Sequence, residues 1–231
     1  LEPHRGGFPV SAFIFHSLCL MLFLLPLPYG SVEDGAVFAF EAATLVLFAL
    51  HLIDAFKKTE KPEPADPRSK TSLVLSALLA LFFFVVALQL VPLPAAWVRT
   101  ISPRAFDIAA HDLAAGGAGA SSPGFLTLSL APALTARELV LYVSYALFAF
   151  LVYRHAGSRR RVETLVLVCL GAGLFQAVYG LAEFWGGTGR IFGWVNIHNQ
   201  GSAFGTFVNR DHYAGFLEMI FPLSLGFLLA K

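Results

Sequence analysis

A run of polar and charged residues stands directly before the last apolar segment of the chain: Asn209, Arg210, Asp211 and His212. An Arg side chain presents a planar fork of N–H groups that suits phosphate or carboxylate oxygens. The first amide groups of a helix attract anions, and Asn or Asp beside them can cap the helix. Charge at the edge of a bilayer is costly unless it meets water, a partner or a ligand. The run is therefore predicted to start a helix and to bind an anionic group.

The segment that leads into this run and overlaps it, residues 186–211, is rich in glycine and carries a second cation, Arg190. Glycine lets a backbone approach a ligand closely, and Arg190 could bind an anion together with Arg210. A solvated loop with glycine turns explains the same composition. Both interpretations stay open at this point.

Helical spacing pairs Asp211 of the run with one further polar residue and pairs two more in the preceding apolar segment. Asp211 and Glu218 share one stripe of the last apolar segment, which puts Glu218 about two helical turns inside it. Gln176 and Glu183 share one side of the preceding apolar segment. All four are predicted to line a cleft. Two simpler explanations remain: Asp211 could neutralise Arg210, and Gln176 and Glu183 could hold helices together by hydrogen bonds.

Several classes of site are excluded because their motifs do not occur in the sequence. It contains no P-loop, HExxH, CxxC or nucleophile elbow, which argues against an ATPase, a zinc site or a soluble-type hydrolase. No metal or cofactor is expected, and nothing suggests nucleic-acid binding. Cys19 and Cys169 lie in apolar runs and are expected to be buried thiols.

The composition indicates a membrane protein. Hydrophobic residues make up 57% of the chain, charged residues only 13%, and the mean hydropathy is +0.70, whereas soluble domains carry about 25% charged residues. A helix needs about 20 residues to cross the hydrocarbon core. The predicted fold class is all-α, one polytopic transmembrane helical bundle over residues 1–231 with about six spans: residues 9–29, 35–56, 71–91, 135–153, 162–185 and 212–230.

The distribution of Lys and Arg predicts the orientation. Basic residues gather in residues 57–70 and 154–161, which are therefore cytoplasmic, as is the N-terminus. Residues 57–70 are a solvated linker. Residues 92–134 and 186–211 are outer loops, and a short interfacial helix is expected to start at Pro103 in the first of them. A capping box at residues 135–138 should start the fourth span.

The last segment of the chain contains the run Gly205-Thr-Phe-Val-Asn-Arg-Asp-His-Tyr-Ala-Gly215, followed by an apolar helix with a Pro. This pattern resembles that of the bacterial O-antigen ligases and related polysaccharide polymerases. Two shorter matches stand in the same order, Gln89-Leu-Val-Pro-Leu-Pro94 and Leu128-Ser-Leu-Ala-Pro132. The resemblance covers about residues 85–230. Two positions depart from the family pattern: Asp211 replaces its usual Asn, and Ser202 replaces an Arg that many members carry.

The resemblance implies a multi-span glycosyltransferase of the bacterial inner membrane that builds cell-envelope polysaccharide or lipopolysaccharide. Such an enzyme moves a glycan from undecaprenyl diphosphate to a hydroxyl of a lipid or glycan acceptor, on the periplasmic side and without a metal. Arg210, Asn209, His212 and Arg190 would then lie in the diphosphate region. The family's large periplasmic loop, with another essential Arg and a His, would follow Lys231. We therefore expect residues 1–231 to be the inactive N-terminal half, with no catalytic base assigned.

Two other classes of protein remain open from the sequence. A polysaccharide flippase or other transporter would line a path through the spans with charge, for which Glu41, His51 and Glu218 are candidates. A non-catalytic membrane assembly protein would need no such path and no ligand at the polar run.

Overall fold

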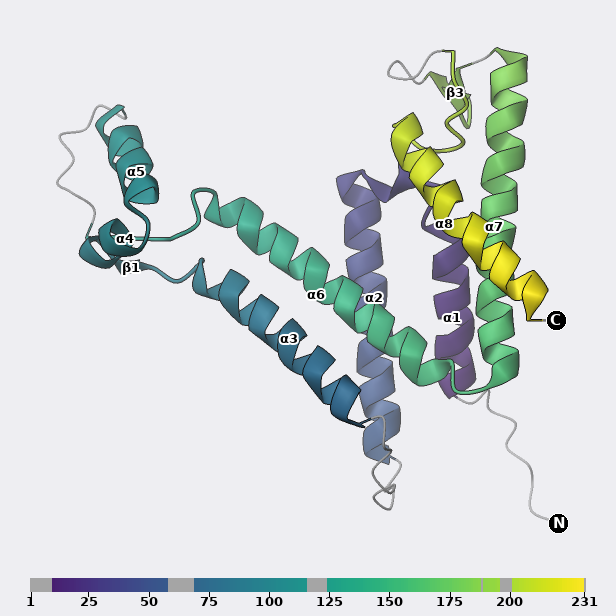
Figure 1. Cartoon of the computed structure of the whole chain (residues 1–231), viewed down its shortest axis with the longest axis horizontal. Helices are drawn as coiled ribbons and strands as arrows, with labels where there is room; N and C mark the ends of the chain where they lie inside the picture. The colour runs from purple at the N-terminus through teal and green to yellow at the C-terminus, as the bar shows by residue number, and fades with distance from the viewer. Residues whose placement is uncertain (1–9, 58–68, 116–123, 188, 196–200, 231) are drawn as a thin grey trace. The chain divides into compact units, whose positions relative to one another are not determined.

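A computed structural model describes residues 10–57, 69–115, 124–187, 189–195 and 201–230, without the side chains of residues 69–73 and 112–115. The described chain is mostly helical (Figure 1). Its long helices are α1 (Val10–Leu24), α2 (Asp34–Lys57), α3 (Ser69–Leu88), α6 (Pro132–His155), α7 (Arg159–Gly186) and α8 (Arg210–Leu229). Two shorter helices, α4 (Ala95–Ile101) and α5 (Pro103–Ala115), lie between α3 and α6 in the sequence.

The expected class of helical membrane protein is confirmed, because an apolar helix lies in each of the six predicted ranges. Within the described residues, four helices are long and apolar enough to cross a membrane: α2, α6, α7 and α8. The apolar stretches Val10–Leu24 and Val74–Leu88 are shorter. The first helix ends earlier than predicted, at Leu24, because Pro26 and Pro28 follow it and proline disrupts a continuing helix.

The chain forms two compact units, and each is described by itself. The first comprises residues 1–59 and 144–231, of which the described parts include α1, α2, the second half of α6, α7 and α8. Here α1 packs against both α2 and α7, and α7 packs against α8. A small core of Ile14, Leu18, Leu47 and Leu151 joins α1, α2 and α6.

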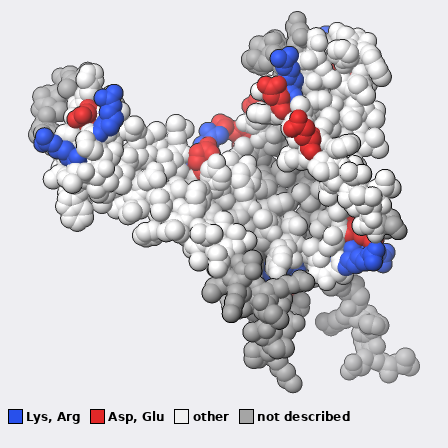
Figure 2. All heavy atoms as spheres, viewed as in Figure 1, with Lys and Arg blue, Asp and Glu red and all other residues white. Residues whose placement is uncertain are grey.

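The ends of the helices in this first unit carry its charge. On the face shown in Figure 2, charged side chains gather near the start of α8 and at the start of α7, with uncharged surface between them. Outward-facing residues of the helices, such as Phe38 and Phe56, are large and apolar. Such a surface is suited to lipid rather than to water.

The second unit, residues 60–143, contains α3 to α5 and the first half of α6. A pair of two-residue strands, β1 (Leu93–Pro94) and β2 (Phe125–Leu126), joins the segment before α4 to the segment that follows α5. The helix predicted to start at Pro103 is confirmed as α5. Its residue Ala105 and Val98 of α4 are buried where these two helices pack together.

The predicted capping box at the start of the fourth span is wrong. Helix α6 begins at Pro132, three residues before Thr135, so Thr135 lies inside the helix and its N–H donates to Ala131 O (3.0 Å). Ser129 Oγ accepts the N–H of Ala131 (3.2 Å), and the fixed φ of a proline suits a first helical position. This earlier start needs no contribution from Glu138.

The predicted linker, residues 57–70, lies mainly outside the described residues. The predicted outer loop, residues 186–211, is described except for residues 188 and 196–200. It contains a small hairpin of β3 (Arg190–Ile191) and β4 (Trp194–Val195). Cys19 and Cys169 are free thiols; Cys19 is buried, as expected, whereas Cys169 is only half-buried.

Candidate functional site

Helix α8 starts at the polar run, as predicted. Asn209 is its N-cap, in an extended backbone conformation, and Asn209 Oδ1 accepts the N–H of Asp211 at 2.8 Å. Arg210 Nε lies 3.7 Å from Asp211 Oδ1, so the neutralising pair that the sequence allowed does form. Because the two side chains are 63% and 80% exposed, water screens this pair and it contributes little. The Arg210 guanidinium remains accessible to a ligand.

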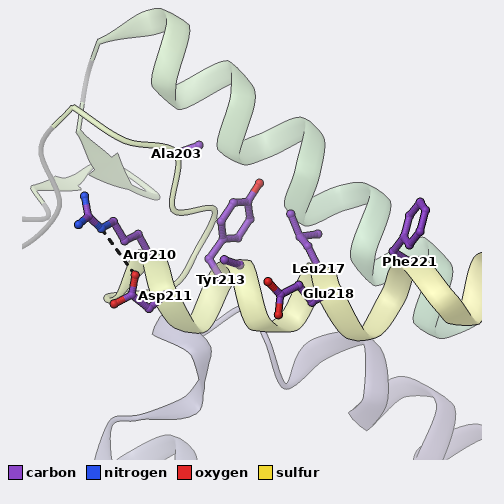
Figure 3. Close-up of a pocket in the computed structure, with 8 residues that line it drawn as sticks. Ala203, Arg210, Asp211, Tyr213, Leu217, Glu218 and Phe221 are labelled. Carbon is purple, nitrogen blue, oxygen red and sulfur yellow. Dashed lines mark ion pairs between the residues drawn. The ribbon is translucent and has the colours of Figure 1, made fainter.

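A groove of about 630 Å³ runs along α8 from this helix start (Figure 3). Arg210 and Asp211 lie at its polar end, and Glu218 lies on the same helix two turns further along. The structure therefore places Asp211 and Glu218, which were expected to share a stripe, in one groove with Arg210. The remaining lining residues are mostly apolar: Ala203, Tyr213, Ala214, Leu217 and Phe221.

The apolar wall of the groove was missed by the sequence analysis. Tyr213, Leu217 and Phe221 recur every four residues, so they lie on one stripe of α8. Their spacing was a usable signal, but apolar residues in an apolar segment do not stand out.

Gln176 has a different role from the one predicted for a cleft residue. Its side chain is fully buried, with 0% exposure, and is not among the residues that line the groove on α8. Gln176 Nε2 donates to Thr206 Oγ1 (2.7 Å), and Gln176 Oε1 accepts the N–H of Thr206 (2.9 Å). Thr206 Oγ1 in turn donates to the carbonyl oxygen of Pro26 (2.6 Å), just beyond the end of α1. Gln176 thus holds helices together, which was the simpler of its two explanations.

Close packing completes this buried anchor, which we define as Pro26, Gln176, Gly205, Thr206 and Tyr213. Gly205 has φ +55°, and a Cβ added there would lie 2.5 Å from Gln176 Oε1 and 2.7 Å from the Tyr213 ring. The Tyr213 hydroxyl donates to the backbone oxygen of Gln176 (3.3 Å). The buried anchor therefore fixes the start of α8 against α7 and the end of α1.

The other predicted site residues do not line the groove. His212 is exposed in the first turn of α8, next to Asp211. Arg190 is exposed on β3, in a hairpin that is held to α7 because the Phe192 N–H donates to the Tyr179 hydroxyl (2.7 Å). Glu183 is half-buried on α7.

Comparison with protein-family models, curated proteins and solved structures gave no match to this chain. The chemistry of the site is therefore argued from its own geometry. Among the described residues, no three His, Cys, Asp or Glu side chains gather in the way that a metal site requires.

The groove combines a cation and the free amides of a helix start with a long apolar wall. A helix N-terminus carries a partial positive charge, which adds to that of Arg210. An elongated ligand with an anionic head and an apolar body matches this groove, which is cationic at one end and apolar along its length. The two carboxylates, Asp211 and Glu218, are suited to accept hydrogen bonds from hydroxyl groups.

Proposed function

We propose that this chain is the N-terminal part of an O-antigen ligase-like glycosyltransferase, whose donor is a glycan linked to undecaprenyl diphosphate. The observation that carries the proposal is the position of Arg210 at the polar end of a groove whose wall continues through Leu217 and Phe221. The diphosphate would lie at Arg210 and the polyprenyl chain along the apolar wall. The resemblance of residues 205–223 to that family supports the same assignment.

Arg210 would contribute by stabilising the negative charge of the leaving diphosphate. When the glycan leaves its carrier, negative charge grows on the diphosphate, and a guanidinium can bind two of its oxygens at once without a metal. Asn209 supports this arrangement by capping the helix, so that α8 starts at Arg210. Asp211 and Glu218 repel phosphate and would instead contact hydroxyl groups of the sugar. The acceptor is a hydroxyl of a lipid or another glycan, and none of the described residues is assigned as the base that would deprotonate it.

The proposed location is the bacterial inner membrane, with the N-terminus in the cytoplasm, six spans and the groove facing the periplasm. Its support is the separation of charge within the first unit. Lys57, Arg154 and Arg159 lie at helix ends remote from the start of α8, as the excess of basic residues on the cytoplasmic side requires.

The test is glycan transfer by the full-length protein in proteoliposomes, with a purified undecaprenyl-diphosphate glycan as the donor. We expect Arg210→Ala to lower the rate at least about 100-fold, the usual effect of removing one group that stabilises a leaving oxyanion. Arg210→Lys should recover part of the rate, because it restores the charge but not the fork. The matched control is Arg160→Ala, which removes an exposed arginine at the start of α7 and should leave the rate unchanged. A normal rate for Arg210→Ala would remove Arg210 from the site.

The alternative of a flippase or transporter has less support. Two of its candidate residues lie at different ends of the first unit: His51 hydrogen-bonds to His155 at the end of α6, whereas Glu218 lies near the start of α8. A charged path would have to connect them; the third candidate, Glu41, is half-buried on α2, ten residues before His51.

A further inference from the structure

A second polar cluster lies in the first unit, remote from the groove, where four helices meet. It consists of Ser11 on α1, His51 on α2, His155 at the end of α6 and Arg161 on α7. His155 is only 5% exposed; its Nε2 lies 3.3 Å from His51 Nδ1, and its Nδ1 lies 3.3 Å from Ser11 Oγ. Arg161 donates to the backbone oxygen of His155 (3.0 Å) and to Ser11 Oγ (3.4 Å). One set of contacts thus joins the ends of α1, α2, α6 and α7.

Fixed charges surround the two imidazoles. The Arg161 guanidinium stacks over the Phe15 ring of α1 at 5.0 Å from its centroid, which holds its positive charge in place. Arg154 of α6 adds a second positive charge that acts on His155, and Asp54 of α2 adds a compensating negative charge. The centroids of the two His rings are 5.2 Å apart.

The bond between the two rings depends on how many protons they carry. A neutral imidazole has one N–H donor and one nitrogen acceptor, whereas a protonated imidazole has two donors and no acceptor. The contact between His155 Nε2 and His51 Nδ1 needs a proton on one nitrogen and a lone pair on the other. It therefore survives a single added proton but not a second. Two charged rings would also repel each other and the neighbouring Arg161.

We propose that His51 and His155 form a pH-sensitive latch, which holds the ends of α2 and α6 together until both imidazoles are protonated. Imidazole titrates near pH 6.5, about the middle of the physiological range. When two sites interact, the second proton binds at lower pH than the first. The latch therefore opens below the pH at which an isolated imidazole titrates. It is independent of the groove on α8 and of the transfer reaction proposed for it.

The test is the distance between spin labels on α2 and α6, measured by pulsed electron paramagnetic resonance on the full-length protein in nanodiscs. Phe56 (86% exposed) and Tyr153 (73% exposed) lie near the ends of these helices and are suitable labelling positions once both native cysteines are replaced by alanine. We expect the mean distance to increase between about pH 8 and about pH 5, the range that brackets imidazole titration.

Two variants separate the latch from other effects of acid. His155→Gln keeps a hydrogen-bonding side chain that does not titrate, so its distance at about pH 5 should equal the wild-type value at about pH 8. The control is His16→Gln, which removes an exposed histidine of α1 whose ring bonds within its own helix (His16 Nδ1 to Ala12 O, 2.7 Å). This control should keep the full wild-type response to pH.

The latch is refuted if the wild-type distance is the same at both pH values, or if His155→Gln responds to acid as the wild type does. Folding of His155→Gln is checked by its distance at the higher pH, which must match the wild type. If that variant does not fold, His51→Gln replaces it, because it removes the titratable ring of the other partner and should likewise abolish the response to acid.

Discussion

Two glycines within one motif are predicted to respond in opposite ways to the same substitution. Gly205 and Gly215 begin and end the run that resembles the ligase family. Gly205 lies in the buried anchor with φ +55°, a conformation that costs an L-residue about 1–2 kcal/mol. Its new methyl group would also lie 2.5 Å from Gln176 Oε1, an atom that already accepts the N–H of Thr206. Overpacking of this kind typically costs about 1–3 kcal/mol.

Together these two effects predict that Gly205→Ala lowers the free energy of unfolding by about 2–5 kcal/mol. Gly215 lies inside α8, where a Cβ would meet nothing within 4 Å. Because Ala favours helix over Gly, Gly215→Ala should be neutral or stabilising by up to about 1 kcal/mol.

The assay is unfolding of the full-length protein in detergent, by heat or by titration with a denaturing detergent, with both variants beside the wild type. Near-equal unfolding of Gly205→Ala and wild type would refute the account of the buried anchor. So would an equal loss in both variants, because the motif would then be sensitive throughout rather than at the anchor.

The same unfolding assay checks two further variants. Gln176→Leu should destabilise the protein by about 1–3 kcal/mol, since it leaves the buried N–H of Thr206 without an acceptor. The bond from Thr206 Oγ1 to Pro26 O is kept in this variant. Wild-type stability would mean that water or another group replaces the Gln176 amide. Asn209→Ala removes the N-cap of α8 and should cost about 1 kcal/mol, whereas Asn209→Asp should stay close to wild type because a carboxylate caps equally well. A loss with Asp as large as that with Ala would contradict a capping role.

Sequence patterns located the helices because the signal for an apolar helix is local. Hydropathy predicted the six ranges in which the described residues form apolar helices, and the polar run predicted the start of α8, with either Asn209 or Asp211 as its cap. The same kind of local signal failed at the start of α6, where a capping box at Thr135 competed with Pro132 and Ser129. Two start signals three residues apart cannot be ranked without the surrounding contacts.

The candidate site was predicted only in part, since its parts depend on contacts between distant segments. Asp211 and Glu218 lie on one stripe of α8, which spacing alone can predict, and Arg210 lines the same groove. Gln176 was grouped with them from its polarity, yet its side chain bonds to Thr206, which is 30 residues away, and does not line the groove. No periodicity in the sequence reports such a pairing.

The bond from Thr206 to Pro26 can form only late in synthesis of the described chain. The two residues are 180 positions apart, so the carbonyl at the end of α1 emerges from the ribosome long before its partner. At about 5–20 residues per second, synthesis of the intervening chain takes about 10–40 s. During that interval α1 and α2 can enter the membrane, and the Pro26 carbonyl can accept only the local N–H of Gly30 (3.3 Å) until Thr206 adds a second donor. The end of α1 is therefore tied to the segment before α8 only after α2 to α7 have been synthesised, and a nascent chain stopped before Thr206 would lack the bond from Thr206 to Pro26.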